Sequence, residues 1–160
     1  MVVGQMDKVE ALMANFPNLD YRFNPRMPKK LKGLCDGDII WLNPNQHETE
    51  LPGNLAEEIG HHLTGIGKIT DQKNNAERKQ EQKARDVGAK IIVTPADILA
   101  CYKEGLIYRW ECAEYLGITL KTLNQAIEVY AKTNDGKIKY NHYTIYFKPN
   151  GIVEIFDWFK

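Results

Sequence analysis

The alternation of apolar and polar residues predicts three helices in the first hundred positions. Leu55, Ile59 and Leu63 lie four residues apart, which places them on one apolar stripe of a helix. Gly65 and Gly67 are expected to end that helix, because glycine readily adopts the left-handed conformation that closes a helix. The three predicted helices cover residues 1–16, 51–64 and 76–92.

Turn residues between short apolar runs predict two β-hairpins. Asp36-Gly37 and Asn150-Gly151 are both residue pairs that favour tight hairpin turns. The flanking strands are expected over residues 33–35 and 38–42 for the first hairpin, and over 143–147 and 152–156 for the second. The basic, proline-rich stretch 21–32 is expected to be a loop that contains at most one short strand.

Three shorter helices are expected in the second half of the chain, separated by Gly105 and Gly117. They cover residues 96–103, 108–116 and 120–131. Helices and short strands in separate runs predict an α+β fold class. The expected parts are a core domain over 1–95, a helical module over 96–132, and a C-terminal β-hairpin over 133–160 that packs on the core.

The helical module has the layout of a helix-turn-helix around Gly117. A helix that reads DNA needs several basic or amide side chains, and this one offers only Lys121, Asn124 and Gln125. Three carboxylates oppose contact with phosphate: Glu111, Glu114 and Glu128. We therefore expect a structural or substrate-docking module and do not favour direct DNA binding, although a DNA-binding regulator stays open as an alternative.

Composition and charge narrow the class of protein. A chain of 160 residues that is 43% hydrophobic and 26% charged suits one compact domain of an ordinary globular protein. The 21 basic residues balance 21 acidic ones, which argues against a dedicated nucleic-acid binder. Cys35, Cys101 and Cys112 form no CxxC pair, so we expect free thiols in a reducing compartment, the cytoplasm. No signal peptide and no membrane-spanning run is expected.

The segment from Glu57 to His62 combines two carboxylates and two imidazoles on the predicted helix 51–64. Glu57 and His61 are four residues apart and so point the same way, with Glu58 about 100° around the helix beside them. In the helical H-E-x-x-H motif, two histidines at this spacing hold zinc and the glutamate between them is the general base. A carboxylate can also coordinate zinc, so Glu57 is an admissible replacement for the first histidine.

A catalytic zinc site needs a third protein ligand and one open position. Glu81 on the predicted helix 76–92 is the candidate. Ala84, Gly88 and Ala89 are small, which would let this helix approach the first one closely. The remaining histidines stand outside any ligand-like spacing: His47 and His142.

A second register places the ligands at Glu58 and His62, which are also four residues apart. In that register Ile59 follows the first ligand, and an aliphatic side chain cannot act as a base. The register with Glu58 as the base is therefore favoured, and His62 is expected to pack, to hydrogen-bond behind the ligands, or to steady an oxyanion.

A purely structural interpretation also has to be weighed. Asn54-x-x-Glu57 fits a capping box at a helix N-terminus. Glu81 stands in a run of charged residues and, taken alone, is typical of a solvated helix face. The sequence pattern by itself leaves both interpretations open.

The segment Leu55–Thr64 resembles the active-site helix of the ImmA/IrrE family of metallopeptidases. The hairpin over 33–42 resembles the strand pair that precedes that helix, and residues 79–95 resemble the segment that carries the family's third, glutamate ligand. The resemblance implies a zincin-like core with one Zn²⁺ per chain, another divalent ion being admissible. It also implies that members cleave a repressor or transcriptional regulator encoded nearby in a phage or mobile element, typically a Cro/repressor-like protein.

Carried over by position, the resemblance implies that His61 and Glu81 are metal ligands, that Glu58 is the general base, and that Glu57 occupies the place of the first histidine. A second carboxylate adds negative charge, which is expected to weaken the activation of water by the metal and to leave slow or partner-dependent activity. Glu57→His is accordingly expected to tighten metal binding or speed cleavage. A catalytically weak member that sequesters a regulator is the main alternative.

Overall fold

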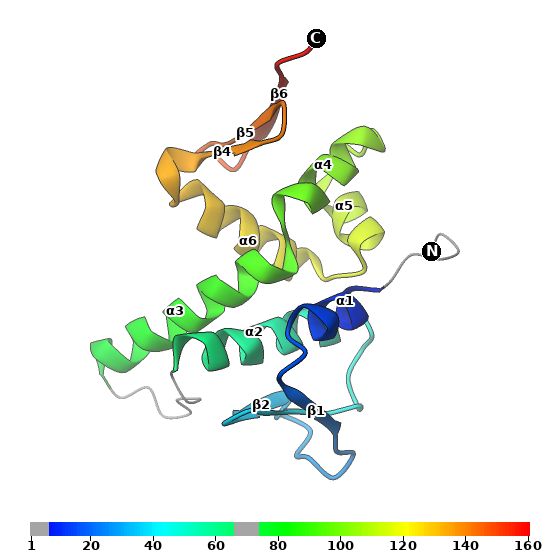
Figure 1. Ribbon diagram of the computed structural model, residues 1–160, viewed down its shortest axis with the longest axis vertical. Coiled ribbons are helices and arrows are strands. Elements are labelled where there is room, and N and C mark those ends of the chain that lie inside the picture. The colour runs from blue at the N-terminus through cyan, green and yellow to red at the C-terminus, as the bar shows by residue number, and fades with distance from the viewer. Residues whose placement is uncertain (1–6, 66–73) are drawn as a thin grey trace. The chain divides into compact units, whose positions relative to one another are not determined.

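A computed structural model describes residues 7–65 and 74–160 of the chain. These residues form two compact units, one ending at Ile92 and the other covering Val93–Lys160. Mixed helices and small sheets make up both units, so the predicted α+β class is confirmed (Figure 1). The predicted division at residues 95 and 132 stays a prediction, as do the zincin-like character of the core and the packing of the C-terminal strands on it.

The first unit contains three helices and a three-stranded sheet in the described residues. Its elements are α1 (Lys8–Asn15), β1 (Asp20–Phe23), β2 (Gly33–Asp36), β3 (Ile39–Leu42), α2 (Leu51–Thr64) and α3 (Asn75–Ile92). Asp7 caps α1 by accepting a hydrogen bond from the Glu10 amide at 2.8 Å, so this helix begins inside the predicted 1–16 segment, whose first six residues lie outside the described part.

The sheet of the first unit has the order β1-β3-β2. The predicted hairpin is confirmed: β2 and β3 are antiparallel, with Gly33 opposite Leu42, and Gly37 in their turn has a φ of 59°. The strand β1, which the sequence pattern left inside a loop, pairs in parallel with β3. Helix α2 lies between this sheet and α3 (Figure 1).

Helices α2 and α3 touch through their backbones because small residues face one another. A Cβ atom on Gly60 would lie 2.2 Å from the carbonyl oxygen of Ala84, and one on Gly88 would lie 2.7 Å from that of Ala56. The close approach expected from Ala84 and Gly88 is therefore present, and Gly60 and Ala56 supply the matching surface on α2. This contact sets where the side chains of the two helices meet.

A buried amide organises the loop that leads into β2. Asn43 is fully buried, and its side-chain nitrogen donates hydrogen bonds to the carbonyl oxygens of Pro28 at 3.2 Å and Leu31 at 3.0 Å. Its side-chain oxygen accepts a hydrogen bond from the Asn45 amide at 2.9 Å. These bonds satisfy buried polar groups and hold the loop closed just before the hairpin.

One expectation about α2 is wrong, and one interpretation that the sequence left open is excluded. Leu63 does not complete the buried stripe, since 48% of it is exposed while Leu55 and Ile59 are fully buried. Asn54 does not cap the helix, because α2 already begins at Leu51 and the Asn54 side chain bonds to Gln46. The helix still has the predicted bounds, and Gly65 closes it with a φ of 69°. Gly67 lies outside the described residues.

The second unit contains three helices, a short 3₁₀ turn and a second three-stranded sheet. Its elements are α4 (Pro95–Lys103), α5 (Arg109–Leu116), α6 (Leu120–Ala131), η1 (Asn134–Gly136), β4 (Lys137–Tyr140), β5 (Tyr143–Phe147) and β6 (Val153–Asp157). The sheet order is β4-β5-β6, so the predicted C-terminal hairpin is present as β5 and β6, and β4 adds a third strand that was not predicted. Strand β4 was missed because its alternation of lysine with Ile138 and Tyr140 is short and half polar.

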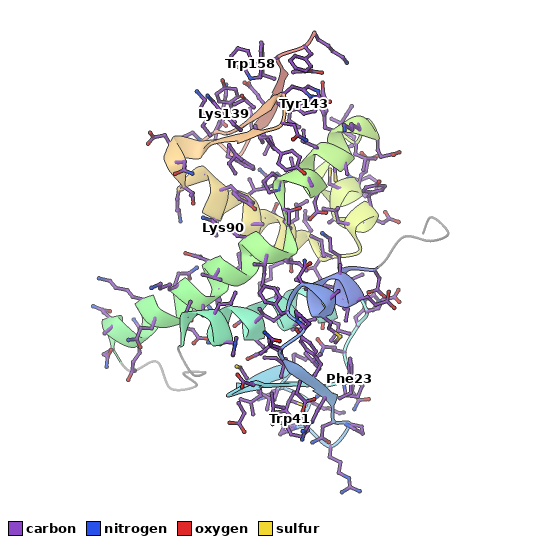
Figure 2. The ribbon with its side chains drawn as sticks, viewed as in Figure 1. Phe23, Trp41, Lys90, Lys139, Tyr143 and Trp158 are labelled. Atoms are coloured by element: carbon purple, nitrogen blue, oxygen red, sulfur yellow. The ribbon has the colours of Figure 1, made fainter. Side chains whose placement is uncertain are left out.

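Helix α6 packs on β5 through stacked aromatic rings. The Tyr130 and Phe147 rings lie 5.0 Å apart, and the Tyr130 hydroxyl donates a hydrogen bond to the Val93 carbonyl at 2.7 Å. Trp158, labelled with Tyr143 in Figure 2, donates to the Thr144 hydroxyl at 2.7 Å. These contacts give the second unit its own core.

Helices α5 and α6 occupy the positions of the predicted helix-turn-helix-like module, with Gly117 in the left-handed conformation between them. Arg109 at the start of α5 donates to Asn124 at 2.8 Å and to the carbonyl of Gly151. The functional role of the module stays a prediction. Among the described residues, the helices are too short or too polar to span a membrane.

Candidate metal centre

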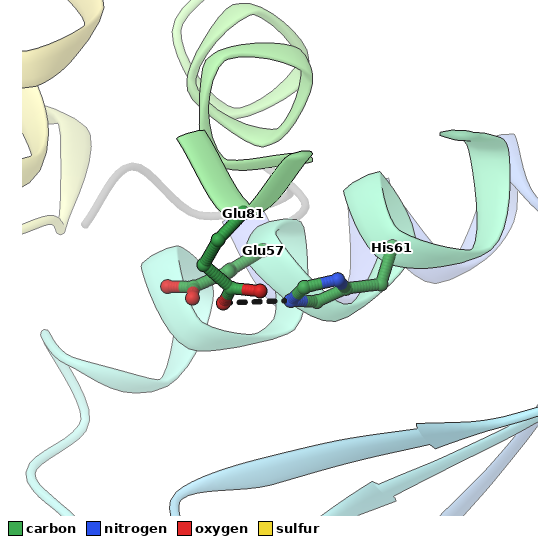
Figure 3. A group of neighbouring side chains, drawn as sticks. All are labelled: Glu57, His61 and Glu81. Carbon is green, nitrogen blue, oxygen red and sulfur yellow. Dashed lines mark ion pairs between the residues drawn. The ribbon is translucent and has the colours of Figure 1, made fainter. Parts of the chain in front are cut away.

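Three side chains from α2 and α3 converge on one point. Each of Glu57, His61 and Glu81 offers one potential ligand atom, and these atoms all lie within 4.8 Å of one another (Figure 3). Glu57 and His61 lie one helical turn apart on α2, as their spacing predicted. The structure thus brings together the three residues that the sequence pattern singled out as metal ligands.

Glu81 faces the imidazole of His61 from the neighbouring helix. Its Oε1 atom lies 3.4 Å from the His61 Nε2 atom, and the side chains are 3% and 0% exposed. Buried ionisable groups are costly unless they meet a partner or a metal, so this burial is not expected of a solvated helix face. The close approach of Gly60 to Ala84, three residues beyond Glu81, brings the carboxylate within reach.

Glu57 is the most exposed member of the cluster and has a cationic neighbour. The Arg85 Nε atom donates to the Glu57 Oε1 atom at 3.3 Å, with 41% of the arginine side chain and 29% of the glutamate side chain exposed. Sequence analysis missed Arg85, although its position four residues after Glu81 places both on one face of α3. That spacing was the signal that could have identified it.

Glu58 lies on the side of α2 that faces the sheet, and only 2% of it is exposed. A Cβ atom on Gly33 would lie 2.8 Å from the Glu58 Cγ atom and 3.2 Å from its Oε1 atom, so the carboxylate rests against the backbone of β2. Burial raises the pKa of the Cys35 thiol, and the carboxylates of Glu58, Asp36 and Asp38 raise it further. The thiol of Cys35 therefore stays protonated beside this carboxylate.

His62 points away from the cluster and towards the hairpin. Its Nδ1 atom lies 3.1 Å from the carbonyl oxygen of Gly37 and 3.9 Å from the Asp38 carboxylate. The structure thus gives Glu58 and His62 different neighbours, which supports the register based on Glu57 and His61. His62 ties the end of α2 to the β2–β3 turn. Its predicted role behind the ligands stays a prediction.

The other histidines and the cysteines do not belong to the group of converging side chains found in the described residues. His47 contacts Thr49, its own neighbour in the chain, and His142 lies 3.6 Å from the Asp157 carboxylate in the second unit. The cysteines, in the described part of the chain, are free thiols, as expected.

The chemistry of the three side chains fits a divalent metal ion. An imidazole nitrogen and two carboxylate oxygens are established zinc donors, and three protein ligands with one open position are typical of a catalytic site. The mixed nitrogen and oxygen set also suits Fe²⁺ or Mn²⁺ better than a thiolate site would. The arrangement can therefore hold an ion between α2 and α3, and Glu58, the residue that follows Glu57 on α2, is buried.

Comparison with known proteins identifies the family of the chain. The family model of the M78 peptidases, described as the IrrE N-terminal-like domain, matches residues 10–128. The matched range includes α2, α3 and all three converging side chains. No curated protein and no solved structure matches the chain.

Proposed function

Because the chain belongs to the IrrE N-terminal-like family of M78 metallopeptidases, we propose that it is a zinc-dependent endopeptidase whose substrate is a repressor or transcriptional regulator. The observation that carries this proposal is the convergence of Glu57, His61 and Glu81, with the buried Glu58 next to Glu57 in the chain. The regulator as substrate rests on the resemblance of residues 55–64 and 79–95 to ImmA/IrrE proteins, which act on regulators encoded beside them.

His61, Glu81 and Glu57 are the residues that would hold the ion. A bound divalent ion supplies Lewis acidity, which activates water and polarises the carbonyl group of a peptide bond. His61 contributes as the neutral imidazole, because a protonated ring has no lone pair to donate. The burial of His61 and Glu81 keeps competing water away from two of the three donors.

Glu58 is assigned the proton transfers. Its carboxylate accepts a proton as water attacks the peptide carbonyl, and it then delivers this proton to the leaving amine. The contact with Gly33 fixes the position of the carboxylate between α2 and β2. A positioned acid–base group of this kind contributes roughly 10²- to 10⁴-fold to the rate.

Metal content and cleavage together test the proposal. The purified chain is expected to bind one zinc ion and to cleave the helix-turn-helix regulator encoded by the adjacent gene. His61→Ala should lose the metal, whereas His47→Ala, an exposed histidine outside the cluster, should keep it. Glu58→Gln should keep the metal and lose cleavage, with Glu48→Gln as the exposed control.

Each outcome separates the alternatives. Failure of the wild-type chain to bind a divalent ion would overturn the peptidase proposal. Metal binding together with tight binding but no cleavage of the regulator would favour the sequestering alternative. A shift of operator DNA by the chain alone at physiological salt would favour a DNA-binding regulator.

A further inference from the structure

We propose that Arg85 offsets the charge of Glu57, so that a donor set with two carboxylates behaves like one with a single carboxylate. The inference rests on the proposed metal site and concerns how this chain accommodates a glutamate where the H-E-x-x-H motif has a histidine. Arg85 lies outside the set of donors and acts through Glu57.

The geometry of α3 places Arg85 beside the site. Arg85 follows Glu81 by one helical turn, and its Nε atom lies 3.3 Å from the Glu57 Oε1 atom. Glu81 approaches His61 from the same face of α3, at 3.4 Å. One face of α3 therefore supplies both a donor to the cluster and a cation to the most exposed carboxylate in it.

The formal charges of the donors explain how the contact between Arg85 and Glu57 would affect a bound ion. Two neutral imidazoles and one carboxylate carry one negative charge, whereas Glu57, His61 and Glu81 carry two when His61 is neutral. The guanidinium of Arg85 is always protonated and returns the local sum to one. A less negative environment leaves more of the ion's positive charge to act on water and on the carbonyl group.

Removing Arg85 has two opposing effects on metal affinity. The lost hydrogen bond frees the Glu57 carboxylate, which weakens binding, while the lost cation removes a repulsion from the ion, which tightens it. The hydrogen bond is long for a charged pair and both side chains are partly exposed, so it orients Glu57 only weakly. The charge effect needs no such alignment and is therefore expected to dominate.

The sequence-based expectation for Glu57→His changes accordingly. With Arg85 still present, that substitution removes the carboxylate but keeps the cation, so the local charge falls to zero. Glu57→His alone is expected to bind metal more weakly than the double substitution Glu57→His with Arg85→Gln. Restoring the histidine should help only when the arginine is also neutralised.

The test measures the affinity of the whole chain for Zn²⁺ alone, by competition with a fluorescent chelator at fixed ionic strength. Arg85→Gln is expected to bind Zn²⁺ about tenfold more tightly than the wild type and to cleave substrate more slowly. Arg85→Lys keeps the charge and should stay close to the wild-type affinity. Lys83→Gln removes an exposed charge that lies about 200° around α3 from Arg85, and it should change neither the zinc affinity nor the cleavage rate.

The outcomes distinguish this inference from the proposed function. Zinc binding by the wild type with equal affinity in Arg85→Gln, or weaker affinity than in Lys83→Gln, would overturn the role of Arg85 and leave the metal site intact. Absence of zinc binding in the wild type would overturn both. Tighter binding in Arg85→Gln, with cleavage recovered on adding Glu57→His, would support the compensation.

Discussion

Gly60→Ala should separate the two helices that carry the metal site. The added Cβ atom would lie 2.2 Å from the Ala84 carbonyl oxygen, about 0.8 Å inside the 3.0 Å that real Cβ atoms keep, and 3.1 Å from the Gly88 amide nitrogen. Both obstacles are backbone atoms of α3, which cannot rotate away as a side chain would. The helices must therefore shift apart, and Glu81 would move with α3 away from α2, which carries His61.

Two terms set the magnitude for Gly60→Ala. Overpacking of a tight contact costs about 1–3 kcal/mol, and replacing glycine by alanine inside a helix returns about 1 kcal/mol. The difference is about 0–2 kcal/mol in the free energy of unfolding, and we expect a net loss near the upper end because the 2.2 Å contact is with a backbone atom. Because Glu81 moves with α3, zinc affinity should fall roughly tenfold, a loss within the range seen when the support of a metal ligand is removed.

Urea denaturation without metal and zinc competition on the folded chain measure the two effects of Gly60→Ala separately. Gly88→Ala, with a contact of 2.7 Å to the Ala56 carbonyl oxygen, should show the same losses in milder form. Lys83→Ala on the exposed side of α3 is the control and should change neither quantity by much. Unchanged stability and zinc affinity in Gly60→Ala would refute the idea that backbone contact between α2 and α3 sets the site.

Three further predictions concern the surroundings of the site and the second unit. A Cβ atom on residue 33 would lie 2.8 Å from the Glu58 Cγ atom, so Gly33→Ala should displace Glu58 and slow cleavage at least tenfold without changing zinc affinity. A kinetic assay and a zinc titration measure the two quantities, and a fall in both would indicate a purely structural effect. His62→Ala should cost about 1 kcal/mol in urea denaturation through loss of its bond to the β2–β3 turn, and a larger effect on zinc affinity than on stability would contradict its assignment to the hairpin. Burial, with a smaller effect of the Asp97 carboxylate, raises the pKa of Tyr130 from 10.0 to about 12. The unfolded chain therefore loses the tyrosine proton at a lower pH than the folded chain does. The stability that the protonated hydroxyl contributes is present below pH 10 and is lost as the pH rises towards 12. Tyr130→Phe should lower stability by about 1 kcal/mol at neutral pH, since the bond to Val93 is lost, and should lose less on going from pH 10 to pH 12 than the wild type; identical pH profiles would contradict the assignment.

Local signals in the sequence were sufficient to predict α2 and the hairpin before it. Pro52 near the start of α2 and Gly65 at its end mark boundaries through their own backbone preferences, and the structure follows them. Asp36-Gly37 likewise fixes its turn locally. The grouping of Glu57 and His61 needed only the pitch of a helix.

Features that depend on distant partners were predicted less well. Glu81 was a candidate because of the small residues that follow it, and the resemblance strengthened the choice, but a glutamate among charged residues gives no sign of burial until α2 is placed beside it. The pairings of Arg85 with a residue 28 positions away and of Asn43 with residues up to 16 positions away depend on the fold. For Arg85 the spacing from Glu81 indicates only the face of the helix, and for Asn43 no local pattern indicates the partners. Leu63 was assigned to the core because helical spacing alone cannot tell how wide the buried face is.

All three converging donors belong to the helices α2 and α3, between residues 57 and 81, within the unit that ends at Ile92. The second unit has a core of its own, closed by Tyr130 and Phe147. Mutations that reshape the surface of the second unit therefore leave the donors untouched. The donor set can therefore be inherited through the first unit alone, whatever changes accumulate on the surface of the second.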